Sequence, residues 1–258
     1  MKRTNGSFLH SYLEAANRTS KEVLEEDPIA LDLIEKCDDL IAHLVSTDQS
    51  KLGLVGHALA LNAYFLFMAS VRTAISGHPG AVHSTLRSAL EHACYAFLIV
   101  EDEQRAEVWL KRNVDKDGNK EQRATFGQAV HRASTEMEKY DPETASRIKA
   151  LYDAAIDFGA HPNPKSVLAH LTVDSTQSSD SQVLTCLYPW SQETGRGLLA
   201  CLEFGIAIIS ILVITKTKCP PLQVTNPELF DLMIRRDDVA VQHYGLKVEN
   251  GRVIYNAF

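Results

Sequence analysis

The sequence predicts a mainly α-helical protein, a helical bundle with one small β hairpin. Two observations lead to this prediction. Apolar residues recur three and four positions apart in successive segments, which is the period of an amphipathic helix. One later segment has two short apolar runs around a polar turn, which is typical of a hairpin. With 258 residues the chain is long enough for a sizeable core, and we expect one helical domain over 1–258.

The composition excludes several classes of protein. With 45% hydrophobic and 23% charged residues the chain does not resemble a disordered protein. Its 13 Gly, 9 Pro and 5 Cys exclude collagen-like and disulfide-scaffold proteins. A formal net charge of -7 argues against a dedicated nucleic-acid coat, and no DNA-binding signature is present.

The N-terminal part, residues 1–50, predicts two amphipathic helices over 7–24 and 27–46. Pro28 suits the first turn of the second helix, where its missing N–H costs nothing. A strongly apolar helix is expected over Leu54–Ile75 and another over Val82–Val100.

Charge is unevenly distributed along the chain. Residues 51–100 contain four charged side chains, whereas residues 101–150 contain 21. We therefore expect the first stretch to be interior and the second to form a solvated face. Basic residues of the second stretch alternate with acidic ones, which favours a solvated helical surface over a nucleic-acid interface.

The charged stretch predicts three further helices, over Glu103–Arg112, Glu121–Lys139 and Pro142–Phe158. An exposed turn is expected at Asp115–Lys120, because it contains Gly, Asn and Asp. Gly159 is the expected C-cap of the third helix.

The core of the bundle, 51–215, also contains the predicted hairpin near 167–188, with arms Val167–Val173 and Gln182–Tyr188. A long apolar helix follows to about Thr215. Within it Gly197, Cys201 and Gly205 form a small-residue stripe that permits close approach of a neighbouring helix.

The segment Leu198–Thr215 of this helix has two interpretations. Its length of about 27 Å would nearly cross a bilayer. A helix buried on all sides in a bundle explains the same residues, and we favour it because Glu203 interrupts the apolar run. We therefore do not expect a membrane association. This helix is apolar on nearly all sides, so a monomer would expose one of its apolar flanks as a large patch. We therefore expect a homo-oligomer, most simply a homodimer.

The tail, 216–258, is predicted to be a C-terminal appendage. It contains a short helix over Pro227–Arg235 and a strand pair with arms Leu246–Val248 and Arg252–Tyr255.

Targeting and cysteine patterns indicate a cytoplasmic protein. The N-terminus has no apolar segment behind its basic residues, so no secretory signal is predicted. None of the five cysteines forms a CxxC motif, and we interpret them as reduced thiols. Motifs for metals, nucleotides and the common hydrolases do not occur, so we expect no metal and no cofactor.

A polar row within the charge-poor stretch is the first candidate site. His83, Arg87 and Glu91 are four residues apart, so they share one face of a helix. Arg87 and Glu91 can pair directly. The pair is either architectural, joining this helix to a neighbour through Arg72, or part of a functional site, where buried charges are often tolerated.

Arg87 and His92 also have the spacing R-x4-H in a central helix. This resembles the HEPN superfamily of helical bundles. The resemblance covers this helix and the helical character of the chain. It implies a metal-independent ribonuclease site, commonly assembled at a dimer interface. In that case Arg87 would stabilise phosphate charge and His92 would act as general acid or base, and RNA would be the substrate.

A third candidate lies at the end of the helix predicted over Pro142–Phe158. Asp157 and His161 are four residues apart on one face. His161 is either a residue favoured at the helix end by the dipole, or it joins His83, Glu91 and Asp157 in a polar ligand-binding pocket.

Two functions of different classes follow from these observations. The first is a non-catalytic interaction or ligand-binding module in which Arg87 and Glu91 are architecture. The second is a HEPN-like endoribonuclease or toxin that uses Arg87 and His92. The sequence leaves open whether the protein is an enzyme.

Overall fold

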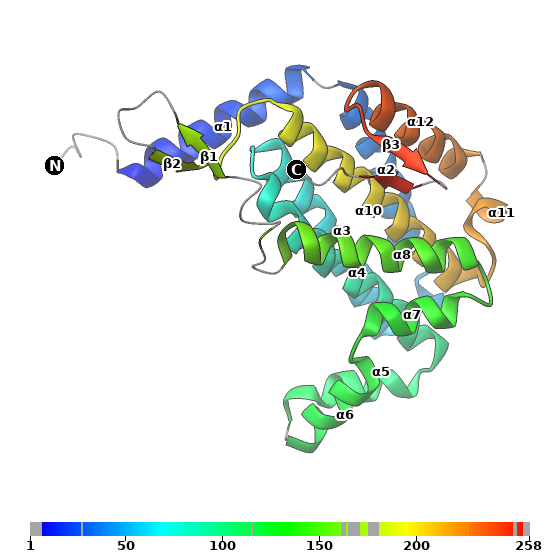
Figure 1. Cartoon of the computed structure of the whole chain (residues 1–258). Helices are drawn as coiled ribbons and strands as arrows, with labels where there is room; N and C mark the ends of the chain where they lie inside the picture. The colour runs from blue at the N-terminus through cyan, green and yellow to red at the C-terminus, as the bar shows by residue number, and fades with distance from the viewer. Residues whose placement is uncertain are drawn as a thin grey trace.

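The computed structural model describes residues 7–26, 28–114, 116–160, 164, 171–174, 181–225, 227–249 and 252–254. It confirms a mainly α-helical fold (Figure 1). Two long helices, α3 and α10, have the strongest apolar character. The helices are α1 (Phe8–Glu26), α2 (Pro28–Ser46), η1 (Gln49–Lys51), α3 (Gly53–Ile75), α4 (Pro79–Glu101), α5 (Gln104–Leu110), η2 (Lys111–Asn113), α6 (Lys116–Phe126), α7 (Ala129–Met137), α8 (Pro142–Ala155), η3 (Ile156–Ala160), α10 (Gln192–Thr217), α11 (Pro221–Thr225) and α12 (Glu228–Gln242).

Helix α10 is the centre of the bundle. It packs against α2, α3, α4, α8 and α12, and it runs through the middle of the molecule in Figure 1. Every residue from Gly197 to Thr215 is buried. A helix that is apolar on all sides needs this environment. The expectation of a buried bundle helix is therefore confirmed within a single chain, and α10 leaves no exposed flank of the kind from which we expected a homodimer.

The small-residue stripe of α10 allows the predicted close approach. A Cβ atom added to Gly205 would lie 3.0 Å from the ring of Phe67 and 3.2 Å from Cys37, so α2 and α3 both come close to the backbone there. Gly197 similarly faces Ala74 and Pro79.

Helices α3 and α4 form an extensive antiparallel pair, but they differ in burial. Ten residues of α4 are buried, including Leu90 and Phe97. Only seven of the 23 residues of α3 are buried. The prediction that residues 51–100 are interior is therefore correct for α4 and wrong for one face of α3. Apolar composition does not distinguish a face covered by the chain from one that is not.

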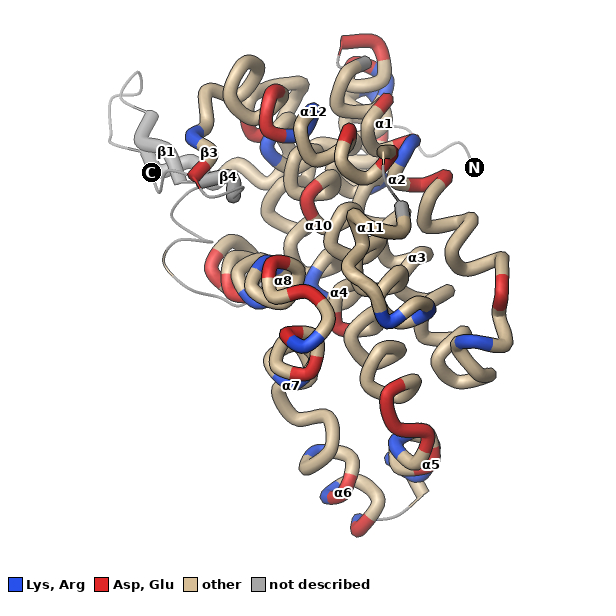
Figure 2. The backbone as a smooth tube through the Cα atoms, turned by 90° about the vertical axis from the view of Figure 1, so that its right-hand side faces the viewer, with Lys and Arg blue, Asp and Glu red and all other residues tan. Residues whose placement is uncertain are grey.

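Within the charged stretch, α5 and α6 form an arm that projects away from the bundle (Figure 2), whereas α7 and α8 pack against α4. Two predictions are wrong here. Lys116–Lys120 is the first turn of α6 rather than a turn between helices, and the helix expected over Glu121–Lys139 is divided into α6 and α7. Gln128 has the left-handed φ of 57° and ends the helical path. The arm is attached to the bundle by Tyr95, which stacks on Phe126 with ring centroids 4.5 Å apart.

Two small hairpins accompany the helices. Strands β1 (Leu171–Asp174) and β2 (Ser181–Leu184) pair antiparallel with Leu171 opposite Leu184. Both predicted arms thus contain a strand, although residues 167–170 lie outside the described part. Strands β3 (Lys247–Glu249) and β4 (Arg252–Ile254) form the strand pair expected in the tail.

Helix α12 is joined to the core by a buried ion pair. Glu203 and Arg236 have side chains that are 6% and 2% exposed, with Oε1 and Nη1 3.4 Å apart. Asp237 lies 2.6 Å from Nε of the same arginine. We expected the helix to end at Arg235. It continues to Gln242, and this extra length supplies a partner for Glu203, the single charge of the buried segment Leu198–Thr215.

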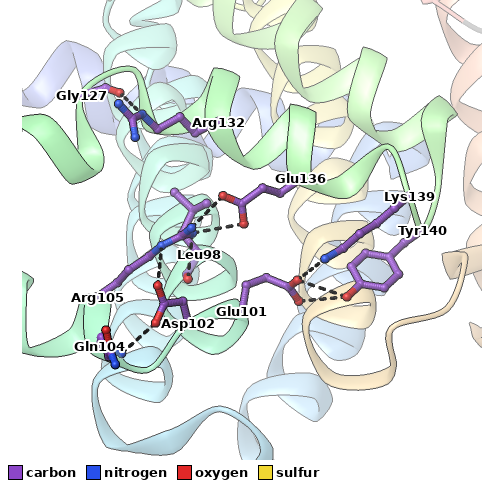
Figure 3. A network of polar contacts seen from close by, with 10 residues as sticks. All are labelled: Leu98, Glu101, Asp102, Gln104, Arg105, Gly127, Arg132, Glu136, Lys139 and Tyr140. Atoms are coloured by element: carbon purple, nitrogen blue, oxygen red, sulfur yellow. Dashed lines mark hydrogen bonds and ion pairs between the residues drawn. The ribbon is translucent and has the colours of Figure 1, made fainter.

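A second polar network joins the C-terminal end of α4 to neighbouring helices (Figure 3). The Arg105 guanidinium donates two hydrogen bonds to the Glu136 carboxylate, at 3.1 and 2.9 Å. Glu101 accepts from Lys139 at 2.6 Å and also pairs with Lys218. These cations hold the pKa of the Glu101 carboxyl below its usual value, against the effect of burial. The network joins α4, α5, α7 and the end of α10.

Candidate functional site

The candidate site lies where the middle of α4 meets α8. Arg87 and Glu91 form the predicted ion pair, with Nε donating to Oε1 at 2.9 Å. Their side chains are 23% and 32% exposed, so the pair is at the protein surface and only half-buried. Such a pair is less costly than one in the core, because water reaches part of both groups.

Tyr152 of α8 is the third member of the cluster. Arg87 donates through Nη2 to the Tyr152 hydroxyl at 3.0 Å, and its Cζ atom lies 5.0 Å from the centre of the same ring. Burial, and then the charge of Glu91, raises the pKa of the Tyr152 phenol. His131 of α7 meets the ring edge-on at 5.7 Å between centroids. The cluster therefore joins α4, α7 and α8.

The predicted connection through Arg72 does not form. Arg72 instead donates to Ser20 at 2.5 Å and to Asn17 at 3.2 Å, both on α1. The neighbour of the Arg87–Glu91 pair is Tyr152. The sequence carried one signal for it, since Tyr152 shares the inward face of α8 with Ile148 and Leu151 and has a hydroxyl group that needs a partner there.

His92 and Arg87 have different hydrogen-bond partners. Its Nδ1 lies 2.7 Å from the carbonyl oxygen of Ser88. Because a carbonyl only accepts, Nδ1 carries the proton and donates it. Five residues advance about 500° around a helix, which separates the two side chains by about 140°. The ring is thus bonded to its own helix, whereas Arg87 is bonded to Glu91 and α8.

His83 lies one turn before Arg87, in the contact between α4 and η3. Its ring faces Phe158 with centroids 5.7 Å apart, and burial lowers the pKa of the imidazole to about 4. Next to it, the Ser84 hydroxyl donates to the carbonyl of Gly159 at 2.9 Å. A Cβ atom on Gly159 would lie 2.5 Å from the carbonyl oxygen of Gly80, so glycine permits this approach.

Three of the four residues predicted to form a polar pocket lie in the described part of the chain. His83 contacts Phe158, whereas Glu91 lies two turns away and binds Arg87. Asp157 belongs to η3, a single π-helical turn, a form found often at functional sites. His161 lies outside the described residues. In the part of the chain that the structure describes, no three His, Cys, Asp or Glu side chains group as metal ligands.

Two surface hollows lie elsewhere, along the contact between α2 and α12. One of about 470 Å³ is lined by residues that include Lys36, His43 and Asp231. The other, of about 490 Å³, includes Leu24 and Arg235. Neither contains a residue of the Arg87 cluster.

Comparison with known proteins adds no relative. The chain matches no protein-family model, no curated protein and no solved structure.

Proposed function

We propose that this protein is a non-catalytic interaction module that presents one face of α3 to a macromolecular partner. The observation that carries the proposal is the exposure of apolar side chains on that helix. Leu54 is 87% exposed, Phe65 61% and Met68 40%. Contiguous exposed apolar surface in a folded protein marks interaction sites.

The polar cluster supports a structural role for Arg87. Its Nε is bonded to Glu91 and its Nη2 to Tyr152, so these donors stabilise the contact between α4 and α8. A group that stabilises phosphate charge needs donors directed at the ligand. His92 is directed toward Ser88, whereas Arg87 is bonded to Glu91 and Tyr152.

A HEPN-like endoribonuclease is the second candidate. The observation that favours it is that solvent reaches Arg87 and Glu91, which are 23% and 32% exposed beside the Tyr152 hydroxyl. In this alternative Arg87 would contact phosphate after the ion pair opens.

Incubation of the purified chain with structured RNA in the presence of a metal chelator separates the two. We expect no cleavage by the wild-type protein. Cleavage that is lost in both Arg87→Ala and His92→Ala would overturn the proposal and establish the ribonuclease. Lys149→Ala, an exposed position on α8, is the matched control for loss of a cation.

A further inference from the structure

One face of α3 points away from the bundle and carries no charged side chain over most of its length. Phe67, on the opposite face of the helix, is fully buried. No charged side chain occurs between Lys51 and Arg72. We define the outer face as Leu54, Ala58, Leu61, Asn62, Phe65, Met68 and Ala69, all exposed except the half-buried Leu61.

Two pairs of exposed positions are related by symmetry about the middle of the helix, whereas exposed Met68 has the half-buried Val55 as its counterpart. Leu54 and Ala69 lie equally far from the point between Leu61 and Asn62, and so do Ala58 and Phe65. A two-fold axis at that point would place a second α3 antiparallel to the first. Each member of a pair would then face its mate in the other copy, as an isologous interface requires.

The side chains are complementary in size under this symmetry. Leu54 would lie opposite Ala69, and Ala58 opposite Phe65, so a large side chain meets a small one at each of these positions. Alternation of large and small residues lets two helix surfaces interdigitate. Asn62 would lie opposite Leu61 of the second copy and about 1.5 Å along the helix from its own equivalent, so the two amides can hydrogen-bond to each other near the axis.

The area is sufficient for a reversible dimer. Leu54, Phe65 and Met68 are 87%, 61% and 40% exposed, and burial of the whole outer face in both copies would remove on the order of 1,000 Å², the lower limit for a specific interface. We therefore expect a weak dimer in equilibrium with monomer, because contacts of this size are typical of transient complexes.

Charge disfavours the other occupants of this face. Lys51 and Arg72, at its two ends, already bind Asp48 and Ser20 respectively, so no cluster of cations adjoins it. An anionic lipid surface attracts apolar faces that are flanked by basic residues, and this chain has a net charge of -7. The outer face also has no charged side chain that could pair with a charged protein partner.

We propose that the partner of the outer face is a second copy of this chain, joined by an antiparallel α3–α3 contact with its two-fold axis at Leu61–Asn62. This inference rests on the proposed interaction function and names its partner. The two proposals fail separately, because RNA cleavage tests the first and the state of association tests the second.

Sedimentation velocity of the full chain, from roughly 1 to 100 µM, tests the inference. We expect a concentration-dependent dimer that Phe65→Glu weakens at least ten-fold, because two carboxylates would be buried in the apolar contact. Ala58→Lys combined with Phe65→Glu should restore association, since each Lys would face a Glu of the second copy. Monomer at all concentrations, or a dimer unaffected by Phe65→Glu, would overturn the inference.

Disulfide formation tests the position of the axis. The exposed thiols are first removed with Cys186→Ser and Cys219→Ser. Asn62→Cys should then cross-link two copies under mild oxidation. Ala58→Cys is the control, because position 58 lies about 10 Å along the helix from its own equivalent in this arrangement. Equal cross-linking at the two positions, or cross-linking at position 58 alone, would contradict the proposed symmetry.

Discussion

Helices α3 and α10 are similar in length and apolar character, yet the protein uses them differently. Both are long and apolar enough to cross a membrane. The apolar window of α10 is completely buried within the chain, whereas only 33% of that of α3 is. Apolar composition therefore predicts that a helix surface needs to be covered, but it does not predict which part of this chain or of a partner covers it. For α10 the cover is the bundle, and for the outer face of α3 we propose a second copy.

The two faces of α3 provide the sharpest test of this difference, with the largest expected effects. Phe67→Ala should lower the free energy of unfolding by about 3–5 kcal/mol, because Phe67 is fully buried against α10. Phe65→Ala, on the same helix, should change the monomer by about 0.5 kcal/mol or less. Urea denaturation at a concentration where the chain is monomeric measures both. Equal losses of stability in Phe67→Ala and Phe65→Ala would contradict the difference in burial between the two faces of α3.

The two ion pairs extend the comparison to charged groups. Arg236→Met removes the buried cation that pairs with Glu203 and should cost about 3–5 kcal/mol. Arg87→Met at the half-exposed pair should cost about 1 kcal/mol, since water can reach Glu91. Chemical denaturation of the two variants checks the order. A larger loss for Arg87→Met would show that its cluster is more deeply integrated into the core than the exposed fractions indicate.

A larger side chain should also have a different effect on stability in each of the two helices. Gly205→Ala places a methyl group 3.0 Å from Phe67 and 3.2 Å from Cys37, and we expect a loss of about 1–3 kcal/mol. Ala58 on the outer face of α3 is exposed, so Ala58→Leu adds its larger side chain on the solvent side. Its effect on the monomer should stay within about 0.5 kcal/mol. Thermal denaturation compares them, and tolerance of Gly205→Ala would contradict the close approach of α2 and α3.

The smallest effect concerns pH and the buried imidazole of His83. Burial lowers its pKa to about 4, below the ordinary value of about 6.5. The imidazole of His83 therefore binds a proton at a higher pH in the unfolded chain than in the folded one. Its contribution to the free energy of unfolding is complete above pH 6.5 and is lost as the pH falls toward 4. We expect a loss of about 1 kcal/mol by pH 5.5. His83→Gln should flatten the stability profile over this range, and an unchanged slope would assign the effect to other groups.

Much of the fold was predictable because helix period and charge are local properties of the sequence. The continuous apolar circumference of α10 predicted its burial, and its three small residues predicted close packing. The spacing of Arg87 and Glu91 predicted their ion pair. Each of these inferences uses only residues within one helix.

The remaining features depend on contacts between distant segments. Tyr152 is 65 residues from Arg87, and no periodicity connects them. The break at Gln128 rests on one left-handed residue, which the sequence did not indicate. The exposed face of α3 has the same apolar residues as a buried one, so only the arrangement of neighbouring helices could distinguish them.

The most direct test of the central claim is the reactivity of a cysteine at the exposed position 58, in a chain that keeps Phe65 and carries Ala58→Cys, Cys186→Ser and Cys219→Ser. The remaining thiols, Cys37, Cys94 and Cys201, are buried, and burial raises the pKa of each, so they should react slowly. We predict that position 58 is labelled as fast as a free thiol in dilute protein, and progressively more slowly as the chain concentration rises. Slow labelling in dilute protein would show that the chain itself covers this face, and a rate independent of concentration would contradict the second copy.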